Sequence, residues 1–205
     1  MTIAWFREYN LSMTLANFLT SLRIILSPFF FIAFFIPVWG GGCFETGSVW
    51  LCWSLFIVIE FSDLFDGMAA RAAHQVSDFG KLFDPFADVF SRLTYFLCFV
   101  GIGLMPVWIM ALIIYREITI MFLRTMMMRK GIAMGARMGG KLKAWAYAIS
   151  GIGGMIFVSI QRLGIFQEVL PELRTVTLVL FIIAGLASLI SLSDYLIVVK
   201  KTISK

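Results

Sequence analysis

Six long apolar stretches constrain the fold of this chain more than any other feature. A hydrocarbon core about 30 Å thick is crossed by roughly 20 apolar residues in helical form. The stretches occupy residues 22–39, 48–62, 83–104, 107–127, 144–160 and 176–199. With 60% hydrophobic and 14% charged residues, the chain cannot cover itself with a polar surface. We therefore predict an all-α integral membrane protein with six transmembrane helices.

Glycine and proline mark the expected breaks between these stretches. Three glycines occupy residues 40–42, Gly103 to Pro106 separate the third stretch from the fourth, and Gly139-Gly140 precede the fifth. The second stretch is short, so we expect its helix to continue past Asp63.

The first residues differ from the rest of the chain. Residues 1–14 mix aromatic side chains such as Trp5 with polar neighbours, a pattern typical of a helix lying on the membrane surface. They carry no cleaved-signal pattern. We predict one membrane domain over residues 1–205, with an interfacial helix at 1–14 and a six-helix body at 15–205.

Basic residues are distributed unevenly between the two sides of this topology. Six spans place both termini, the loop between spans two and three and the loop between spans four and five on one side. Most of the 17 Lys and Arg residues fall there, whereas the other side holds only Arg162 and Arg174. Short cytoplasmic loops are rich in Lys and Arg, so the basic side is expected to be cytoplasmic. We attribute the net charge of +5 to topology and contact with lipid headgroups, and we expect no nucleic-acid partner.

Four aspartates lie at the predicted cytoplasmic ends of the second and third helices: Asp63, Asp66, Asp84 and Asp88. Their spacings of three and four residues put each pair on one helix face. Two antiparallel helices can therefore present four carboxylates to one point, which suits hard divalent cations such as Mg²⁺, Mn²⁺ or Ca²⁺. Two such ions roughly 3.5–4 Å apart would form a clamp for phosphoryl transfer.

These aspartates also have a structural interpretation, in which they cap helices or pair with nearby basic residues, namely Arg71, Lys81 and Arg92. That interpretation suits a single aspartate better than four, because carboxylates so close together repel one another without cations. Glu60 lies about one turn deeper than Asp63 and adds another acid. We expect Glu60 to be protonated or to pair with Arg92.

Written out, the acidic segment is Asp63-x2-Asp66-Gly67-x2-Ala70-Arg71-x8-Gly80-x3-Asp84-x3-Asp88. At every defined position it resembles the signature of the CDP-alcohol phosphotransferase family. The resemblance implies a membrane enzyme that moves a phosphatidyl or related group from a CDP-linked donor to an alcohol and releases CMP. It implies two divalent cations, Mg²⁺ or Mn²⁺, and a homodimer.

The resemblance also implies roles for the aspartates. Asp63, Asp66 and Asp84 would be metal ligands, and Asp88 would be both a ligand and the general base for the acceptor hydroxyl.

Asp63 and four further positions of the signature are expected to receive the nucleotide donor. Gly67 and Ala70 are small and leave room for the nucleotide against the helix backbone, and Arg71 offers a forked donor to phosphate or to the cytosine carbonyl. Gly80 can relax the chain before the third span. No Walker-type glycine-rich loop occurs, so ATP hydrolysis is not indicated.

Two other segments indicate the acceptor alcohol. Residues 15–145, with Asn17-x2-Thr20-x2-Arg23 near their start, resemble the phosphatidylglycerophosphate synthases of this family, which implies CDP-diacylglycerol as donor and glycerol 3-phosphate as acceptor. Asn17, Thr20 and Arg23 are expected to support the site. The phosphate pocket is expected to contain three cations, Arg116, Arg124 and Lys141.

Two observations bear on this acceptor site. Arg116 sits deep in an apolar run and should have a buried partner. Val89 departs from the pattern, because such synthases often have Lys there.

Other interpretations use the same residues. The acceptor could be inositol phosphate, serine, choline or phosphatidylglycerol, and a more distant alternative is a divalent-cation transporter, since carboxylates within a membrane also suit ion pathways. That alternative leaves Gly67, Ala70 and Arg71 unexplained. The expected location is the cytoplasmic membrane of a bacterium, with the active site and both termini facing the cytoplasm and lipids around the helices.

Overall fold

The computed structural model describes residues 15–73, 78–129, 131 and 138–203 of the chain. Side chains are described for these residues except at 15–17, 63–73, 78–82, 138 and 203. The interfacial helix predicted for residues 1–14 lies outside the described residues.

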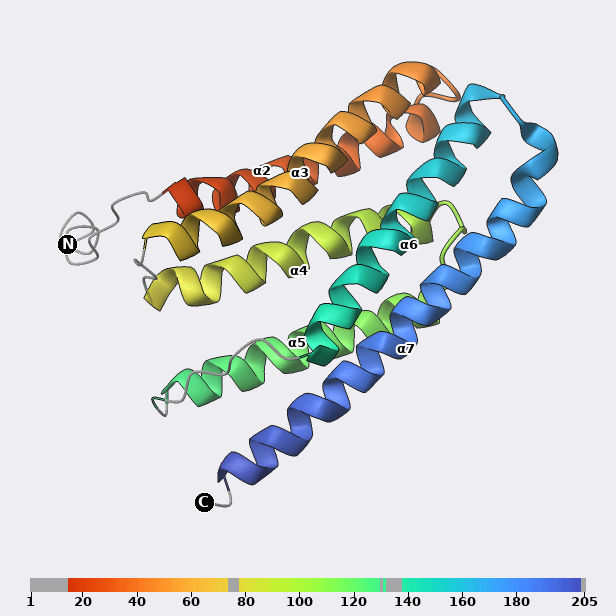
Figure 1. Cartoon of the computed structure of the whole chain (residues 1–205). Coiled ribbons are helices and arrows are strands. Elements are labelled where there is room, and N and C mark those ends of the chain that lie inside the picture. The colour runs from red at the N-terminus through yellow and green to blue at the C-terminus, as the bar shows by residue number, and fades with distance from the viewer. Residues whose placement is uncertain (1–14, 74–77, 130, 132–137, 204–205) are drawn as a thin grey trace.

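The described residues form six α-helices, as predicted, and one short 3-10 helix at Gln167–Val169 (Figure 1). The α-helices are α2 Leu15–Trp39, α3 Glu45–Ala73, α4 Asp78–Gly101, α5 Val107–Arg129, α6 Met138–Leu163 and α7 Leu170–Ile203. Helix α3 continues ten residues past Asp63, which confirms that its short apolar stretch is only part of the helix.

The helices run up and down between two ends of the molecule. In Figure 1 the start of α2, the end of α3, the start of α4 and the ends of α5 and α7 lie at one end. The connections after α2, α4 and α6 lie at the opposite end. We call the first end the signature end, because the acidic segment spans the α3–α4 junction there.

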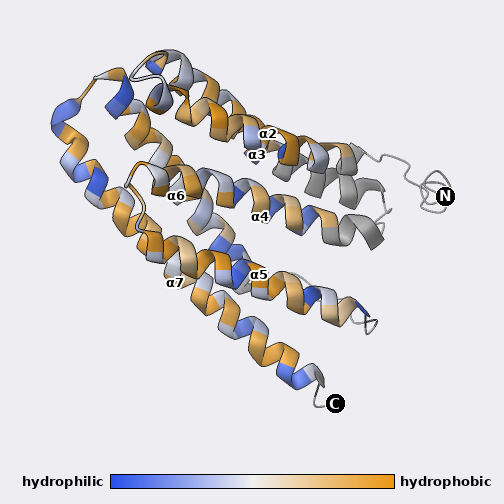
Figure 2. Ribbon diagram, turned by 180° about the vertical axis from the view of Figure 1, so that it is seen from behind, coloured by the Kyte–Doolittle hydropathy of each residue, from blue (hydrophilic) through white to orange (hydrophobic). Residues whose placement is uncertain are grey.

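Within the part of the chain that the structure describes, three helical segments are long and apolar enough to cross a membrane: Phe18–Trp39, Gly139–Leu163 and Gln167–Thr202. Helices α3, α4 and α5 have 29, 24 and 23 residues and carry the charged residues of the candidate site. Figure 2 shows mostly apolar ribbon on all the helices, with polar positions between. The chain is an integral membrane protein.

Two predicted boundaries were wrong. Helix α4 ends at Gly101 and not at Leu104, because Gly103 takes a left-handed conformation with φ of 69° and the Leu104 N–H turns back to donate to the Phe99 carbonyl at 2.9 Å. Gly139 and Gly140 do not break the chain, because they lie in the first turn of α6. A Cβ on Gly139 would lie 3.4 Å from the Ser191 Cα, so this glycine lets α6 approach α7 closely.

An aromatic core joins α2, α4, α6 and α7. The Phe99 ring makes contact with Phe34 and with Phe181, at centroid separations of 6.1 and 5.8 Å. All three side chains are fully buried, and Gly154 of α6 leaves the space that the Phe99 ring fills. Lipid tails are as apolar as these rings, so close packing rather than exclusion of water stabilises the core.

A partly buried arginine joins three helices near the end opposite the signature end. Arg162 of α6 donates to the Ser48 Oγ at 2.8 Å and to the Phe34 carbonyl at 2.7 Å, and its guanidinium lies over the Phe34 ring. These contacts join α6 to α3 and α2. They also give hydrogen-bond acceptors to a guanidinium that would be costly to place without partners in apolar surroundings.

Candidate active site

The acidic part of the site is organised around Arg23. This arginine comes from α2, which packs against both α3 and α4, and its side chain is fully buried. Its Nη2 donates to the Asp84 Oδ1 at 2.6 Å, and its Nη1 donates to the Asp88 Oδ1. Asp84 and Asp88 are four residues apart on α4, as the sequence predicted for one helix face. A single guanidinium therefore brings the two carboxylates together.

The donors present here fit a hard divalent cation. Asp84 and Asp88 offer only carboxylate oxygens, and their side chains are 47% and 29% exposed, so oxygens remain accessible beside Arg23. Such oxygens are the ligands that Mg²⁺ and Mn²⁺ prefer. Among the described residues, no group of three or more potential ligands forms a complete metal site, and the side chains of Asp63 and Asp66 are outside that set.

The remaining signature residues are placed by their backbone alone. Asp63, Asp66, Gly67, Ala70 and Arg71 all lie on the last part of α3, and Gly80 lies in the first turn of α4. Their side-chain surroundings lie outside the described residues, so the predicted nucleotide contacts stay predictions.

The α2 segment predicted as support is partly described. Thr20 is buried one turn before Arg23 on α2, and Arg23 makes the two aspartate contacts. The side chain of Asn17 lies outside the described residues.

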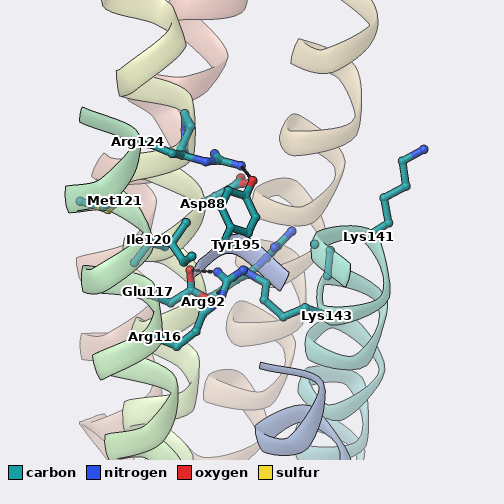
Figure 3. Close-up of a pocket in the computed structure, with 14 residues that line it drawn as sticks. Asp88, Arg92, Arg116, Glu117, Ile120, Met121, Arg124, Lys141, Lys143 and Tyr195 are labelled. Atoms are coloured by element: carbon teal, nitrogen blue, oxygen red, sulfur yellow. Dashed lines mark hydrogen bonds and ion pairs between the residues drawn. The ribbon is translucent and has the colours of Figure 1, made fainter. Parts of the chain in front are cut away.

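A cavity of about 230 Å³ lies next to Asp88, between α4, α5, α6 and α7 (Figure 3). Its charged lining comprises five basic and two acidic side chains, Arg92, Arg116, Arg124, Lys141, Lys143, Asp88 and Glu117. The lining therefore carries an excess of positive charge and suits an anion. Arg116, Arg124 and Lys141, which the sequence assigned to one pocket, all line this cavity.

The inner wall of the cavity is a buried ionic network, which we call the Glu117 network. The Glu117 carboxylate accepts from the Arg116 Nη1 at 2.7 Å and from the Lys143 Nζ at 2.8 Å. Arg116 also donates to the Ser191 Oγ at 2.7 Å. The predicted buried partner of Arg116 is thereby confirmed as Glu117, and the network links α5, α6 and α7.

Arg124 is held by a residue of the last helix. Its Nη2 donates to the Tyr195 Oη at 2.5 Å, and its guanidinium carbon lies 5.4 Å from the centre of the Tyr195 ring. The Nε atoms of Arg124 and Arg116 are buried and have no hydrogen-bond partner in the structure. Two unpaired N–H donors beside one cavity call for a ligand rich in acceptor oxygens.

Of the two lysines in this region, the one assigned to the pocket from the sequence is the more exposed. Lys141 is exposed, and Figure 3 shows its side chain directed away from the other cavity residues. Lys143, which was not among the residues assigned to the pocket, is buried and reaches Glu117. The Lys141 side chain therefore lies at the rim of the cavity, and that of Lys143 lies inside it.

Reasoning from sequence missed Glu117, Lys143 and Tyr195. The charged pair Arg116-Glu117 inside an apolar run was a usable signal, because adjacent opposite charges there call for a further partner. Tyr195 had no such signal, since a tyrosine in an apolar helix is ordinary. Its role follows only from its contact with Arg124, 71 residues away.

Glu60 lies on α3 and Arg92 on α4, and their pairing stays a prediction. Arg92 lines the cavity together with Val89, the position that departs from the synthase pattern. A cation on α4 thus faces the cavity one turn after Val89. The effect of the Glu60–Arg92 pair on activity stays a prediction.

Comparison with known proteins gives the same family as the signature segment. Residues 13–199 match the family model described as CDP-alcohol phosphatidyltransferase. A Treponema pallidum protein named CDP-diacylglycerol–glycerol-3-phosphate 3-phosphatidyltransferase is 34% identical over 194 residues, which cover 90% of this chain and 88% of that protein.

Two further relatives match shorter regions. A Bacillus subtilis protein of the same name is 34% identical over 143 residues, covering 66% of this chain and 73% of that protein. A Mycobacterium tuberculosis (strain H37Rv) protein named probable phosphatidylglycerophosphate synthase is 35% identical over 136 residues, covering 66% and 63% of the two chains.

Proposed function

The chain belongs to the CDP-alcohol phosphatidyltransferase family, and from this premise we propose that it transfers a phosphatidyl group from CDP-diacylglycerol to glycerol 3-phosphate. The products are phosphatidylglycerophosphate and CMP. The observation that carries the choice of acceptor is the basic cavity beside Asp88, with two buried arginine N–H donors that lack partners. A phosphomonoester supplies the oxygens that such donors require, whereas serine and choline carry no phosphate group.

In the proposed reaction, the cavity holds the acceptor phosphate and presents the acceptor hydroxyl to Asp88. Asp88 takes the hydroxyl proton as the oxygen bonds to the phosphorus that carries diacylglycerol. The bond from that phosphorus to the CMP oxygen breaks, and CMP leaves with the electron pair. Arg116 and Arg124 orient the acceptor by its phosphate, so the hydroxyl is held near its target rather than diffusing to it.

Two divalent cations, Mg²⁺ or Mn²⁺, complete the proposal. Asp84 and Asp88 would hold them together with Asp63 and Asp66, and the ions would neutralise charge on the diphosphate as CMP departs. Gly67, Ala70, Arg71 and Gly80 are proposed to receive the nucleotide, on the basis of the signature.

The acceptor is tested directly by supplying alcohols one at a time. Purified protein in lipid nanodiscs would receive CDP-diacylglycerol, Mn²⁺ or Mg²⁺, and glycerol 3-phosphate, inositol phosphate, serine, choline or phosphatidylglycerol. We expect CMP release and labelled phosphatidylglycerophosphate only with glycerol 3-phosphate. CMP release with another alcohol, and none with glycerol 3-phosphate, would reject the proposed acceptor and retain the reaction class.

We also propose that all six helices span the cytoplasmic membrane of a bacterium, with the signature end in the cytoplasm. Cys43 is exposed in the α2–α3 connection at the opposite end, whereas Cys52 and Cys98 are buried. A membrane-impermeant maleimide should therefore label Cys43 in intact spheroplasts, and Cys43→Ser should abolish the label. Labelling of Cys43 only after lysis would reverse the proposed orientation.

The resemblance to the family further supports a homodimer. We expect native mass spectrometry of the protein released from nanodiscs to give twice the chain mass of 23.1 kDa. A single-chain mass across a range of lipid-to-protein ratios would reject the dimer without affecting the proposed reaction.

A further inference from the structure

Tyr195 stands apart from the other cavity residues by its place in the chain. It lies on α7, far along the chain from the acidic signature segment that ends at Asp88. Its side chain is 1% exposed and lines the cavity beside Asp88. The residue is therefore buried at the site, although no motif includes it.

Tyr195 touches Arg124 in two ways. Its hydroxyl oxygen accepts the Arg124 Nη2–H at 2.5 Å, and its ring lies under the same guanidinium at 5.4 Å. A hydrogen bond fixes the direction of one N–H, and the ring contact restricts the plane of the guanidinium. Together they select one orientation of a side chain that otherwise has many rotamers.

This orientation bears on the ligand because the Arg124 Nε–H is buried and unpaired. An arginine that is already oriented loses less conformational freedom when it binds an anion than one that must be immobilised. From these contacts we infer that Tyr195 is a positioning residue of the acceptor site, which acts by holding Arg124 ready for the acceptor phosphate. The inference rests on the proposed function, because it assigns Arg124 to that phosphate.

The inference predicts a specific kinetic change for Tyr195→Phe. This substitution removes the hydroxyl and keeps the buried ring, so the packing of α7 is preserved. We expect the KM for glycerol 3-phosphate to rise about tenfold, as for the loss of one hydrogen bond to a charged group. The kcat and the KM for CDP-diacylglycerol should change less than about twofold, because the hydroxyl serves only ground-state binding of the acceptor. The matched control is Tyr115→Phe on α5, whose side chain is 69% exposed.

A double-substitution cycle separates positioning from direct contact with the substrate. If Tyr195 acts through Arg124, adding Tyr195→Phe to Arg124→Gln should leave the acceptor KM at the value of Arg124→Gln alone. Multiplied effects of the two substitutions would overturn the positioning role. A normal acceptor KM in Tyr195→Phe would overturn it as well, as would an equal loss of kcat for every acceptor tested.

Measuring acceptor binding and the melting temperature without turnover distinguishes weaker acceptor binding from poor folding of the variant. The affinity for labelled glycerol 3-phosphate should fall about tenfold in nanodiscs, while the melting temperature stays near that of Tyr115→Phe. If Arg124→Gln leaves acceptor affinity unchanged, the proposed acceptor site itself fails. If Arg124→Gln weakens binding and Tyr195→Phe does not, only the role of Tyr195 fails.

Discussion

The two parts of the site are built in different ways. In the acidic part, Asp84 and Asp88 are neighbours on one helix and meet one arginine from α2. The basic cavity is assembled from four helices, and its defining contacts join residues 26, 71 and 75 positions apart. A catalytic feature that depends on spacing within one helix can be recognised in a sequence. A binding feature that depends on how helices pack cannot.

The acidic and basic parts of the site are also proposed to have different functions. The acidic part is proposed to carry the chemistry, so changes there should lower turnover or metal affinity. The basic part is proposed to carry recognition and to join three helices, so changes there should alter acceptor affinity or stability. Each substitution below tests that division.

The largest effect is expected at Asp88, the proposed general base. Asp88→Asn should lower kcat by about 10²–10⁴-fold, the usual contribution of general-base catalysis, while affinity for CDP-diacylglycerol stays largely intact. Rapid-quench measurement of CMP release, together with donor binding, checks this. Turnover within threefold of the unaltered protein would remove Asp88 from the chemistry.

The next effect concerns the stability of the Glu117 network. Glu117→Gln leaves Arg116 and Lys143 buried without their carboxylate, and the loss of one partner of a buried ion pair typically costs about 3–5 kcal/mol. Thermal unfolding in lipid should therefore occur at a clearly lower temperature. Glu172→Gln, an exposed change near the start of α7, is the control. An unchanged melting temperature for Glu117→Gln would show that the network adds no stability.

A moderate effect is expected on metal affinity. Asp84→Asn removes one of the proposed carboxylate ligands, and affinity for divalent cations depends on the number of charged ligands. Mn²⁺ binding followed by electron paramagnetic resonance, without substrates, should weaken by roughly tenfold. Chelation with EDTA should stop turnover in the unaltered protein, and added Mn²⁺ or Mg²⁺ should restore it. Full Mn²⁺ affinity in Asp84→Asn would remove this residue from the metal site.

The smallest effect separates the rim of the cavity from its interior. Lys141→Gln should raise the KM for glycerol 3-phosphate only about two- to threefold, because an exposed charge is screened by water and salt. Arg124→Gln should raise the same KM about tenfold, because its Nε–H donor is buried. Equal effects at the two positions would mean that Lys141 turns inward when the acceptor binds.

Part of this site could be predicted from the sequence, and the reason lies in particular residues. The pairing of Asp84 with Asp88 followed from helical spacing, and the buried partner of Arg116 followed from the cost of a charge in an apolar run. The continuation of α3 past Asp63 was expected because its apolar stretch alone was too short.

The rest depended on packing between helices. Gly139 and Gly140 were expected to break the chain, but they lie in the first turn of α6, where Gly139 lets that helix approach α7 closely. The different exposure of Lys141 and Lys143 also depends on packing, since nearby positions of α6 face different surroundings. Arg23 was expected only as support, because the sequence does not show which side chain from α2 reaches the aspartates.

The position of Ser191 and Tyr195 on α7 has a consequence for biogenesis. Of the six helices, α7 is the last to leave the ribosome, so a nascent chain holds the whole acidic segment before Ser191 and Tyr195 can contact Arg116 and Arg124. Until α7 inserts, Arg116 retains the Glu117 carboxylate of its own helix, whereas Arg124 lacks its contact with Tyr195. Insertion of α7 therefore completes the contacts of both arginines, and a chain arrested before α7 should lack the Arg124–Tyr195 hydrogen bond.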